Sequence, residues 1–222
     1  MKQEEELLEE YIEAHIDPEP EALARLRRRT YCRHVYPRMC SGHIQGRLLR
    51  MLAAMVQPRR VLELGTFTGY SALCLAEGMP ADGELHTVEI DDEMEPELTE
   101  LFSVPHPGAP VTLHIGDALD IIPRLPAPWD MVSIDANKRH YADYYRLILP
   151  RMRPGGLILA DNTLWSGKIL HPDAARDPQT RALLEFNDLV AADPRVSRVI
   201  LPVRDGLTIL RVERSDDPKN SF

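Results

Sequence analysis

From residue 60 onward, short apolar runs alternate with segments of helical periodicity, and this alternation restricts the fold more than any other feature. The expected strands are residues 60–64, 84–90, 111–115, 130–134 and 157–160. The expected helices between and after them are residues 70–77, 93–102, 118–124, 140–152 and 179–191. Nearly continuous apolar strands separated by helices are typical of a parallel sheet with helices on both faces. The sequence therefore predicts an α/β, Rossmann-like fold.

The end of the chain breaks this alternation. The runs SRVILPV (197–203) and LTILRVE (207–213) are separated only by RDG, and Asp-Gly between two β-rich runs predicts an antiparallel hairpin. Before residue 60 we expect three helices, at 3–14, at 20–30 with Arg27–Arg29 at its end, and at 44–56. We expect a single domain, 1–222, with a helical extension over 1–56 and a core over 57–214.

Composition narrows the class of protein. The 222 residues are 44% hydrophobic, which suits one domain with a sizeable core. The net charge is -9, from 35 acidic and 26 basic residues, and an acidic chain is a poor default partner for nucleic acid or anionic membranes. We expect no signal peptide, and no apolar run approaches the ~20 residues that span a bilayer. Three cysteines without a Cys-x-x-Cys motif favour thiols in a reducing compartment, so we expect a cytoplasmic protein.

A glycine-containing loop follows the first expected strand. In VLELGTFTGYSAL, Gly65 and Gly69 have G-x-x-x-G spacing, which differs from the G-x-G-x-x-G of dinucleotide-binding enzymes. This loop favours a ligand without phosphates. Glu63 lies within the apolar strand and needs a partner, because burying a lone carboxylate is unfavourable. A ligand ammonium would serve, and an Arg or Lys pair or a capping role is the structural alternative.

The next two strands also end in residues suited to a nucleoside. Glu89, near the end of the second strand, could accept hydrogen bonds from both ribose hydroxyls. Gly116, Asp117 and Ala118 follow the third strand, where an adenine edge could be read. Each feature alone is weak, but together they line the crevice where ligands bind in open α/β sheets.

The fourth and fifth strands each end in a carboxylate. Asp135 follows the fourth, and Asp161 and Asn162 follow the fifth. Adjacent strands lie about 4.8 Å apart, so the two carboxylates can converge. Oxygen ligands without His or Cys suit a hard cation such as Mg²⁺ or Ca²⁺. The structural alternative is that Asp and Asn here act as turn formers and N-caps.

Two further residues near these carboxylates can carry chemistry. Lys138 is a candidate proton acceptor, because a neighbouring cation disfavours its ammonium form; a solvated surface lysine is the alternative. Trp165 can form an apolar wall against a flat aromatic substrate, or can pack as part of the core.

The combined motifs resemble a known family. ELGTFTGYSAL, GDAL, SIDANKRHY, ADNTLWSG and LPVRDGLTI are similar to the cation-dependent O-methyltransferases, which include catechol O-methyltransferase and the caffeoyl-coenzyme A O-methyltransferase group with its bacterial relatives. The resemblance runs from about residue 39 to residue 212. It implies the class I methyltransferase fold, with seven strands of which the last is antiparallel.

The resemblance also implies roles for individual residues. S-adenosylmethionine (SAM) would be held by Ser41, Glu63, Gly65, Thr66, Ser71, Glu89, Ala118, Asp135 and Asn137. The cation would be held by Asp135, Asp161 and Asn162, with Mg²⁺ first and Ca²⁺ or Mn²⁺ as alternatives. Lys138 falls at the position of the catalytic lysine, and Asp135 is assigned a catalytic role with it; Trp165 and Ser166 would contact substrate. The resemblance further implies a homodimer.

The resulting hypothesis is a SAM-dependent, divalent-cation-assisted O-methyltransferase acting on a catechol-like aromatic substrate. Three alternatives remain at this point. The first is a methyltransferase of hydroxylated uridine in tRNA, which a basic patch of Arg25, Arg27, Arg28, Arg29 and Arg33 would support. The second is an NAD-dependent oxidoreductase, disfavoured by the missing third glycine. The third is a non-catalytic SAM-binding or interaction protein.

Overall fold

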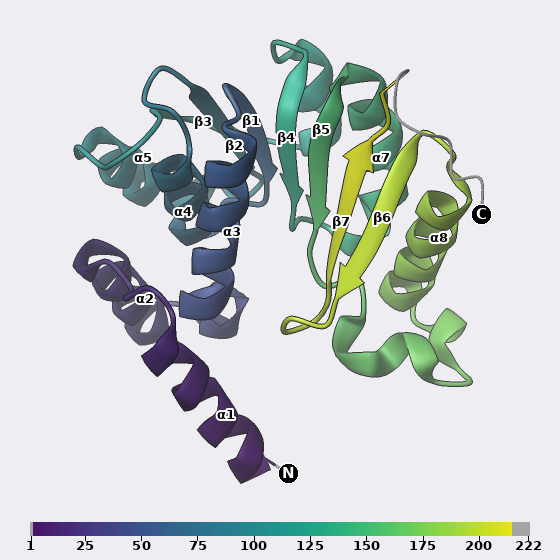
Figure 1. The fold of residues 1–222 in the computed structure, drawn as a ribbon, viewed down its shortest axis with the longest axis horizontal. Helices are drawn as coiled ribbons and strands as arrows, with labels where there is room; N and C mark the ends of the chain where they lie inside the picture. Colours follow the sequence, from purple (N-terminus) through teal and green to yellow (C-terminus); the bar gives the residue numbers. More distant parts are fainter. Residues whose placement is uncertain (1, 215–222) are drawn as a thin grey trace. The chain divides into compact units, whose positions relative to one another are not determined.

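The computed structural model describes residues 2–214 (Figure 1). The contacts within the chain divide it into two compact units. The first contains residues 2–59, Thr66–Leu85 and Glu93–Thr112, and the second contains Arg60–Gly65, His86–Asp92 and the chain from Leu113 onward. Among residues 2–214, no helix has the length and apolar character needed to cross a membrane.

Helices dominate the first unit. They are α1 (Lys2–His15), α2 (Glu21–Arg33), η1 (Pro37–Met39), α3 (Gly42–Val56), α4 (Tyr70–Gly78) and α5 (Glu95–Ser103). The linker between α1 and α2 is tied to α4, because Glu19 accepts hydrogen bonds from the Tyr70 hydroxyl at 2.6 Å and from Arg27 Nη2 at 2.8 Å. Arg47 on α3 pairs with Glu77 on α4 at 2.6 Å. These pairs connect the N-terminal helices of this unit to α4, the helix that follows the glycine loop.

One expectation for these helices is wrong. Helix α2 does not end on the arginine triplet but continues to Arg33. The Thr30 hydroxyl donates to the Leu26 carbonyl one turn earlier, so it bonds within the helix instead of terminating it. The triplet is also only partly a solvated face, because Arg27 pairs with Glu19 at 2.8 Å and Arg29 pairs with Glu97 at 2.9 Å.

A seven-stranded sheet has the order β3-β2-β1-β4-β5-β7-β6. Parallel pairing joins β1 to β4 and β4 to β5, whereas β7 runs antiparallel to both β5 and β6. The predicted mostly parallel sheet with an antiparallel last strand is confirmed. The strands are β1 (Arg60–Leu64), β2 (Glu84–Glu89), β3 (Val111–Ile115), β4 (Trp129–Ile134), β5 (Met152–Ala160), β6 (Val196–Leu201) and β7 (Leu207–Val212).

The core of the second unit lies between its strands and three helices, α6 (Ala118–Ile121), α7 (Tyr141–Ile148) and α8 (Pro178–Ala192). Leu62, Ile134 and Ile158 from three neighbouring strands are fully buried in it. Phe186 of α8 meets Tyr141 of α7 edge to face, with ring centroids 5.5 Å apart. Short 3₁₀ turns complete the connections: η2 (Asp92–Met94), η3 (Ile122–Arg124), η4 (Lys138–His140), η5 (Leu149–Arg151), η6 (Trp165–Leu170) and η7 (Ala174–Arg176).

Strand β5 is longer than the sequence indicates. It begins at Met152 instead of residue 157, although Pro154, Gly155 and Gly156 lie inside it. Such residues usually interrupt a strand, because Pro has no N–H to donate to the neighbouring strand and Gly has no side chain to pack. The pairing with β4 shifts register between Trp129 and Met131, beside this segment. The irregular register accommodates residues that would interrupt an ideal strand.

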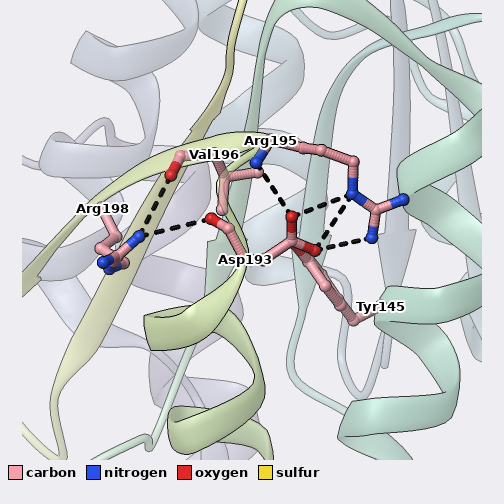
Figure 2. Close-up of polar contacts among 5 residues, drawn as sticks. All are labelled: Tyr145, Asp193, Arg195, Val196 and Arg198. Carbon is pink, nitrogen blue, oxygen red and sulfur yellow. Dashed lines mark hydrogen bonds and ion pairs between the residues drawn. The ribbon is translucent and has the colours of Figure 1, made fainter. Parts of the chain in front are cut away.

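A buried carboxylate joins α7, the end of α8 and the start of β6 (Figure 2). Asp193 caps α8 and accepts hydrogen bonds from the Tyr145 hydroxyl at 2.9 Å and from Arg195 Nη2 at 2.6 Å. The Arg198 guanidinium donates to the backbone carbonyls of Asp193 and Val196. The Arg195 hydrogen bond is the main cause that lowers the pKa of Asp193 to about 2.

This lowered pKa makes part of the stability depend on pH. A carboxyl that is more acidic in the folded chain contributes stability above its unfolded pKa of 3.8, and that stability is lost as the pH falls toward 2. The difference corresponds to about 2 kcal/mol. We expect Asp193→Asn to lower the free energy of unfolding by about that amount at pH 6, and by little near pH 2.

Urea unfolding between pH 2 and pH 7 measures this effect. Asp173→Asn is the matched control, because Asp173 forms an exposed pair with Arg176 three residues on, and such pairs contribute little. A destabilisation by Asp193→Asn that stays the same at every pH would contradict the assignment.

Candidate active site at the carboxyl ends of the strands

The carboxyl ends of five strands are joined in the second unit by one run of backbone hydrogen bonds. Gly116 N donates to Glu89 O at 2.8 Å, and Gly65 N donates to Val88 O at 2.9 Å. Asp135 N donates to Leu64 O at 2.8 Å, and Asp161 N donates to Ile134 O at 2.9 Å. Residues predicted from separate motifs therefore lie in order along one edge of the sheet.

Gly65 occupies a position in this edge that no other residue fits. Its φ is +94°, and a Cβ there would lie 2.1 Å from the carbonyl oxygen of Asp135. The glycine thus lets the end of β1 approach the end of β4 backbone to backbone. The first glycine of the loop is required by this close approach between the candidate cofactor and cation residues.

We expect Gly65→Ala to lower the free energy of unfolding by about 3 kcal/mol or more, because it adds an overlap with backbone to left-handed strain. Gly42→Ala is the matched control: Gly42 has a φ of +78°, but a Cβ there would have no atom within 4 Å. It should lose only about 1–2 kcal/mol. Urea unfolding of both variants gives the comparison, and equal losses would show that the contact with Asp135 is unimportant.

The two glutamates of the candidate cofactor site are held by the protein itself. Glu63 is almost fully buried, and its Oε2 accepts from the Thr87 hydroxyl at 2.6 Å, a partner that the sequence did not indicate. Glu89 Oε1 accepts from the backbone N–H groups of Ile90 and Asp91 at 2.9 and 3.0 Å. Both carboxylates are thereby oriented at the edge of the sheet by neighbouring residues.

The segment after β3 begins a short helix. Asp117 is the N-cap of α6 and accepts from Leu119 N at 2.9 Å, and the buried Ala118 is the first residue of that helix. This part of the motif therefore has a structural role in addition to its candidate role at an adenine edge.

Asp135 and Lys138 meet directly. Lys138 Nζ lies 2.5 Å from Asp135 Oδ1, and both side chains are more than half buried. Between them, Asn137 caps η4, its side-chain oxygen accepting from Arg139 N at 3.2 Å. Lys138 is therefore an anchored residue with its ammonium against a candidate cation ligand, and the alternative of a solvated surface lysine does not hold.

Asp161 is held at the end of β5 beside the end of β4. It is 7% exposed, and its Oδ1 accepts from Asn162 N at 2.8 Å. The register of the parallel pair places Ile134 opposite Ala160, so Asp135 and Asp161 each follow a paired residue. Asn162 has a φ of +61°, a left-handed conformation that Asn tolerates better than most residues.

Tyr141 bridges these two strand ends. It is fully buried, and its hydroxyl lies 3.2 Å from Ile134 O and 3.0 Å from Asp161 O as the donor to both. Burial, and then the charges of Asp135 and Asp161, raise the pKa of this phenol well above its usual value, so it stays a donor.

This donor set suits a hard cation. Asp135, Asp161 and Asn162 supply two carboxylates and an amide oxygen, which is the chemistry that Mg²⁺ and Ca²⁺ prefer. Within residues 2–214, no group of three His, Cys, Asp or Glu side chains could hold a metal. The candidate set has only two such side chains, so its third protein ligand would have to be the amide.

The two candidate substrate residues lie in a loop after β5. Trp165 packs against the core, with Lys138 Nζ 6.0 Å and Lys168 Nζ 5.1 Å from its ring. Its indole Nε1 is buried and has no hydrogen-bond partner within residues 2–214. Ser166 is exposed and donates to Asp205 Oδ1 at 2.9 Å.

Three of the residues assigned to SAM belong to the first unit. Ser41 is the N-cap of α3, Thr66 is buried in the glycine loop, and Ser71 lies in the first turn of α4. The remaining site residues all belong to the second unit.

Sequence reasoning missed the residues that support the site. Tyr141, Asn187 and Asp205 hold the ends of β4 and β5 or the loop beyond them, and Asn187 Nδ2 donates to Thr163 O at 2.9 Å. Tyr141 could have been found from the sequence, because it lies in the motif SIDANKRHY together with Asp135. Asn187 had no such signal, and Asp205 was interpreted only as part of a turn.

The fold is that of the class I methyltransferases, and comparisons with known proteins give the family. The O-methyltransferase family model matches residues 12–213. Caffeoyl-CoA O-methyltransferase 1 of Arabidopsis thaliana is 32% identical over 94% of this chain and 85% of its own length. Caffeoyl-CoA O-methyltransferase 5 of Nicotiana tabacum is 33% identical, over 90% and 88%. The chain belongs to the O-methyltransferase family and is a SAM-dependent O-methyltransferase.

Solved structures agree with this assignment. The O-methyltransferase TomG from Streptomyces achromogenes, in complex with SAM, is 32% identical and has a TM-score of 0.82, covering 92% of this chain and 95% of that one. The SAH-bound methyltransferase PaMTH1 of Podospora anserina is 29% identical with a TM-score of 0.87, covering 96% of both chains.

These comparisons do not favour the alternatives. The NAD-dependent oxidoreductase and the non-catalytic protein have no support from the family or its relatives. The basic patch proposed for tRNA is largely neutralised, because Arg25 pairs with Glu21, Arg27 with Glu19 and Arg29 with Glu97.

Proposed function

We propose that this enzyme transfers the methyl group of SAM to one hydroxyl of a catechol-like aromatic substrate, assisted by a divalent cation. The observation that carries the proposal is the pairing of Lys138 with Asp135 beside Asp161, at the ends of adjacent strands. The plant relatives are caffeoyl-CoA O-methyltransferases, which supports a phenolic acceptor.

Asp135, Asp161 and Asn162 would hold the cation, with Mg²⁺ the first choice and Ca²⁺ or Mn²⁺ the alternatives. A bound cation would supply Lewis acidity that makes the neighbouring hydroxyls more acidic. The position of Asp161 directly after β5, opposite the end of β4 that carries Asp135, supports its role as a ligand.

The residues assigned to SAM have separate tasks in this proposal. Glu63 would meet the ammonium of the methionine part, and Glu89 the ribose hydroxyls. Ala118 would lie at the adenine, while Gly65 and Asn137 border the middle of the cofactor. Ser41, Thr66 and Ser71 are assigned to SAM by the family resemblance alone.

Lys138 would take the proton of the reacting hydroxyl in its neutral form. The hydroxyl oxygen then forms a bond to the sulfonium methyl carbon, the carbon–sulfur bond breaks, and the electron pair stays on the sulfur of S-adenosylhomocysteine. Holding the oxygen and the methyl carbon at near-attack distance would provide much of the acceleration. Trp165 would form the wall against the substrate ring, with Ser166 beside it.

Two further parts of the proposal concern the protein as a whole. A homodimer is supported by the number of large apolar side chains that the first unit exposes, among them Tyr31, Val35, Tyr36, Met39 and Met55. Sedimentation equilibrium tests it. A cytoplasmic location is supported by the three cysteines, which are all thiols and not disulfides.

Transfer of a labelled methyl group from SAM tests the function. The acceptors are catechol, caffeate, caffeoyl-CoA, a flavonoid with adjacent hydroxyls and bulk tRNA, each with Mg²⁺ and with excess chelator. We expect methyl ethers of the catechols only when Mg²⁺ is present. Undiminished methyl transfer in the presence of chelator would show that no divalent cation is needed. Methyl transfer to tRNA alone would show that the substrate is tRNA and not a catechol.

A further inference from the structure

The loop that carries Trp165 and Ser166 has an unusual backbone. We call residues 162–167 the acceptor loop. Trp165 has a φ of +47° and Ser166 a φ of +52°, in addition to Asn162. Left-handed conformations are unfavourable for residues with a Cβ, above all for bulky ones, and persist only where the surroundings enforce them. Some other segment must therefore hold this loop.

The turn of the β6–β7 hairpin holds it. We call residues 203–206 the hairpin turn. The Asp205 carbonyl accepts from Leu164 N at 2.8 Å and from Trp165 N at 3.2 Å, and the Gly206 carbonyl accepts from Thr163 N at 3.0 Å. The contact is close, because a Cβ on Gly206 would lie 2.4 Å from Leu164. The backbone of the acceptor loop is thus fixed by a segment about 40 residues away.

The side chain of Asp205 in the hairpin turn also contacts Ser166. Asp205 Oδ1 accepts the Ser166 hydroxyl at 2.9 Å, directly after the residue that carries the indole ring. The backbone bonds fix Leu164 and the amide of Trp165, whereas the Asp205 carboxylate fixes the residue on the other side of the ring. Asp205 therefore holds the amides of Leu164 and Trp165 through its carbonyl and the Ser166 side chain through its carboxylate, next to the ring that lies 6.0 Å from Lys138 Nζ.

We propose that Asp205 is a positioning residue for the acceptor, and that its bond to Ser166 decides which of two adjacent hydroxyls is methylated. This inference rests on the proposed function. Two neighbouring hydroxyls on one ring differ little in chemistry, so their selection depends on how the ring is placed beside Lys138. If the hydrogen bond between Ser166 and Asp205 is lost, Trp165 can shift. The substrate ring is then placed differently beside Lys138, although no reacting group has been removed.

The test uses Asp205→Ala, Asp205→Asn, Ser166→Ala and the double variant Asp205→Ala with Ser166→Ala. Caffeate is the acceptor, because its two hydroxyls give distinguishable methyl ethers. The measurements are the ratio of the two products, kcat and KM for caffeate, and the Kd for SAM by calorimetry. Asp188→Ala is the matched control, since Asp188 is an exposed acid on α8.

We expect Asp205→Ala to shift the product ratio and to raise KM for caffeate roughly fivefold, the size of one lost hydrogen bond, with an unchanged Kd for SAM. In Asp205→Asn the product ratio and the KM for caffeate should both stay close to those of the wild type, because the amide oxygen can accept from the Ser166 hydroxyl. Ser166→Ala should reproduce the effect, and the double variant should be no worse than either single one. Asp188→Ala should behave as the wild type.

An unchanged product ratio in Ser166→Ala and Asp205→Ala overturns the inference, as does strict additivity in the double variant. Should Asp205→Ala fold poorly, Ser166→Ala removes the same bond from an exposed position, and an unchanged product ratio in that variant overturns the inference. A wild-type enzyme that binds SAM but methylates no catechol overturns the proposed function itself, and the inference with it.

Discussion

Asp161→Ala is expected to lower turnover of a catechol by roughly 100-fold or more and to abolish its dependence on added Mg²⁺, because several kcal/mol of charge stabilisation depend on the cation. Asp161 is one of only two carboxylates in the candidate set, and it is almost fully buried. Binding of SAM should stay within about twofold of the wild type, since the residue directly follows β5, which is separated by β4 from the strands that carry Glu63 and Glu89.

Binding of Mn²⁺, followed by electron paramagnetic resonance without substrate, separates the role of the ligand from activity. We expect the wild type to bind Mn²⁺ and Asp161→Ala to bind it much more weakly. Asp188→Ala serves as the control for the loss of one negative charge. A variant that binds Mn²⁺ and turns over like the wild type would remove Asp161 from the cation site and leave the proposal without its second carboxylate.

The mostly parallel sheet with its antiparallel last strand was within reach of the sequence because it follows from local patterns, whereas the order of the strands required the structure. Apolar runs separated by helices indicate a parallel sheet, and the residue after each run must lie at its carboxyl edge. Asp135 and Asp161 could therefore be placed on one edge without any knowledge of long-range contacts. The hairpin followed from Asp-Gly in the same way.

Errors arose where tertiary contacts overrule a local signal. Pro154, Gly155 and Gly156 indicate an interruption, yet β5 runs through them beside a shifted register. Helix α2 continues to Arg33 although the arginine triplet resembled a helix end. In both elements the packing of neighbours outweighs differences in propensity that amount to about 1 kcal/mol per residue.

Partners of site residues were the least predictable part. Thr87 reaches Glu63 from the adjacent strand, and Tyr141 and Asp205 reach the fifth strand and its loop from 20 and about 40 residues away. A hydroxyl or a carboxylate in a sequence does not specify which distant group it will contact. Chemistry could be assigned to the strand ends, whereas the groups that orient this chemistry required the fold.

Lys138→Ala is expected to lower kcat for a catechol by about 10²–10⁴-fold, the usual range for losing a positioned proton acceptor. The Kd for SAM should change far less, because Lys138 belongs to η4 and its direct partner is Asp135. Stopped-assay kinetics and calorimetry give the two values. The variant also leaves Asp135 without its ammonium, so a second substitution is needed to separate charge from proton transfer.

Lys138→Arg makes that separation. A guanidinium keeps the positive charge beside Asp135 but cannot give up its proton at neutral pH, so this variant should keep stability and SAM binding while kcat stays low. An acidic acceptor such as 4-nitrocatechol has a hydroxyl that is already partly ionised. The turnover of this acceptor should therefore fall much less in both Lys138 variants than the turnover of caffeate. If Lys138→Arg turns over caffeate at the wild-type rate, Lys138 does not take the proton, and its pairing with Asp135 serves only to hold that carboxylate in place.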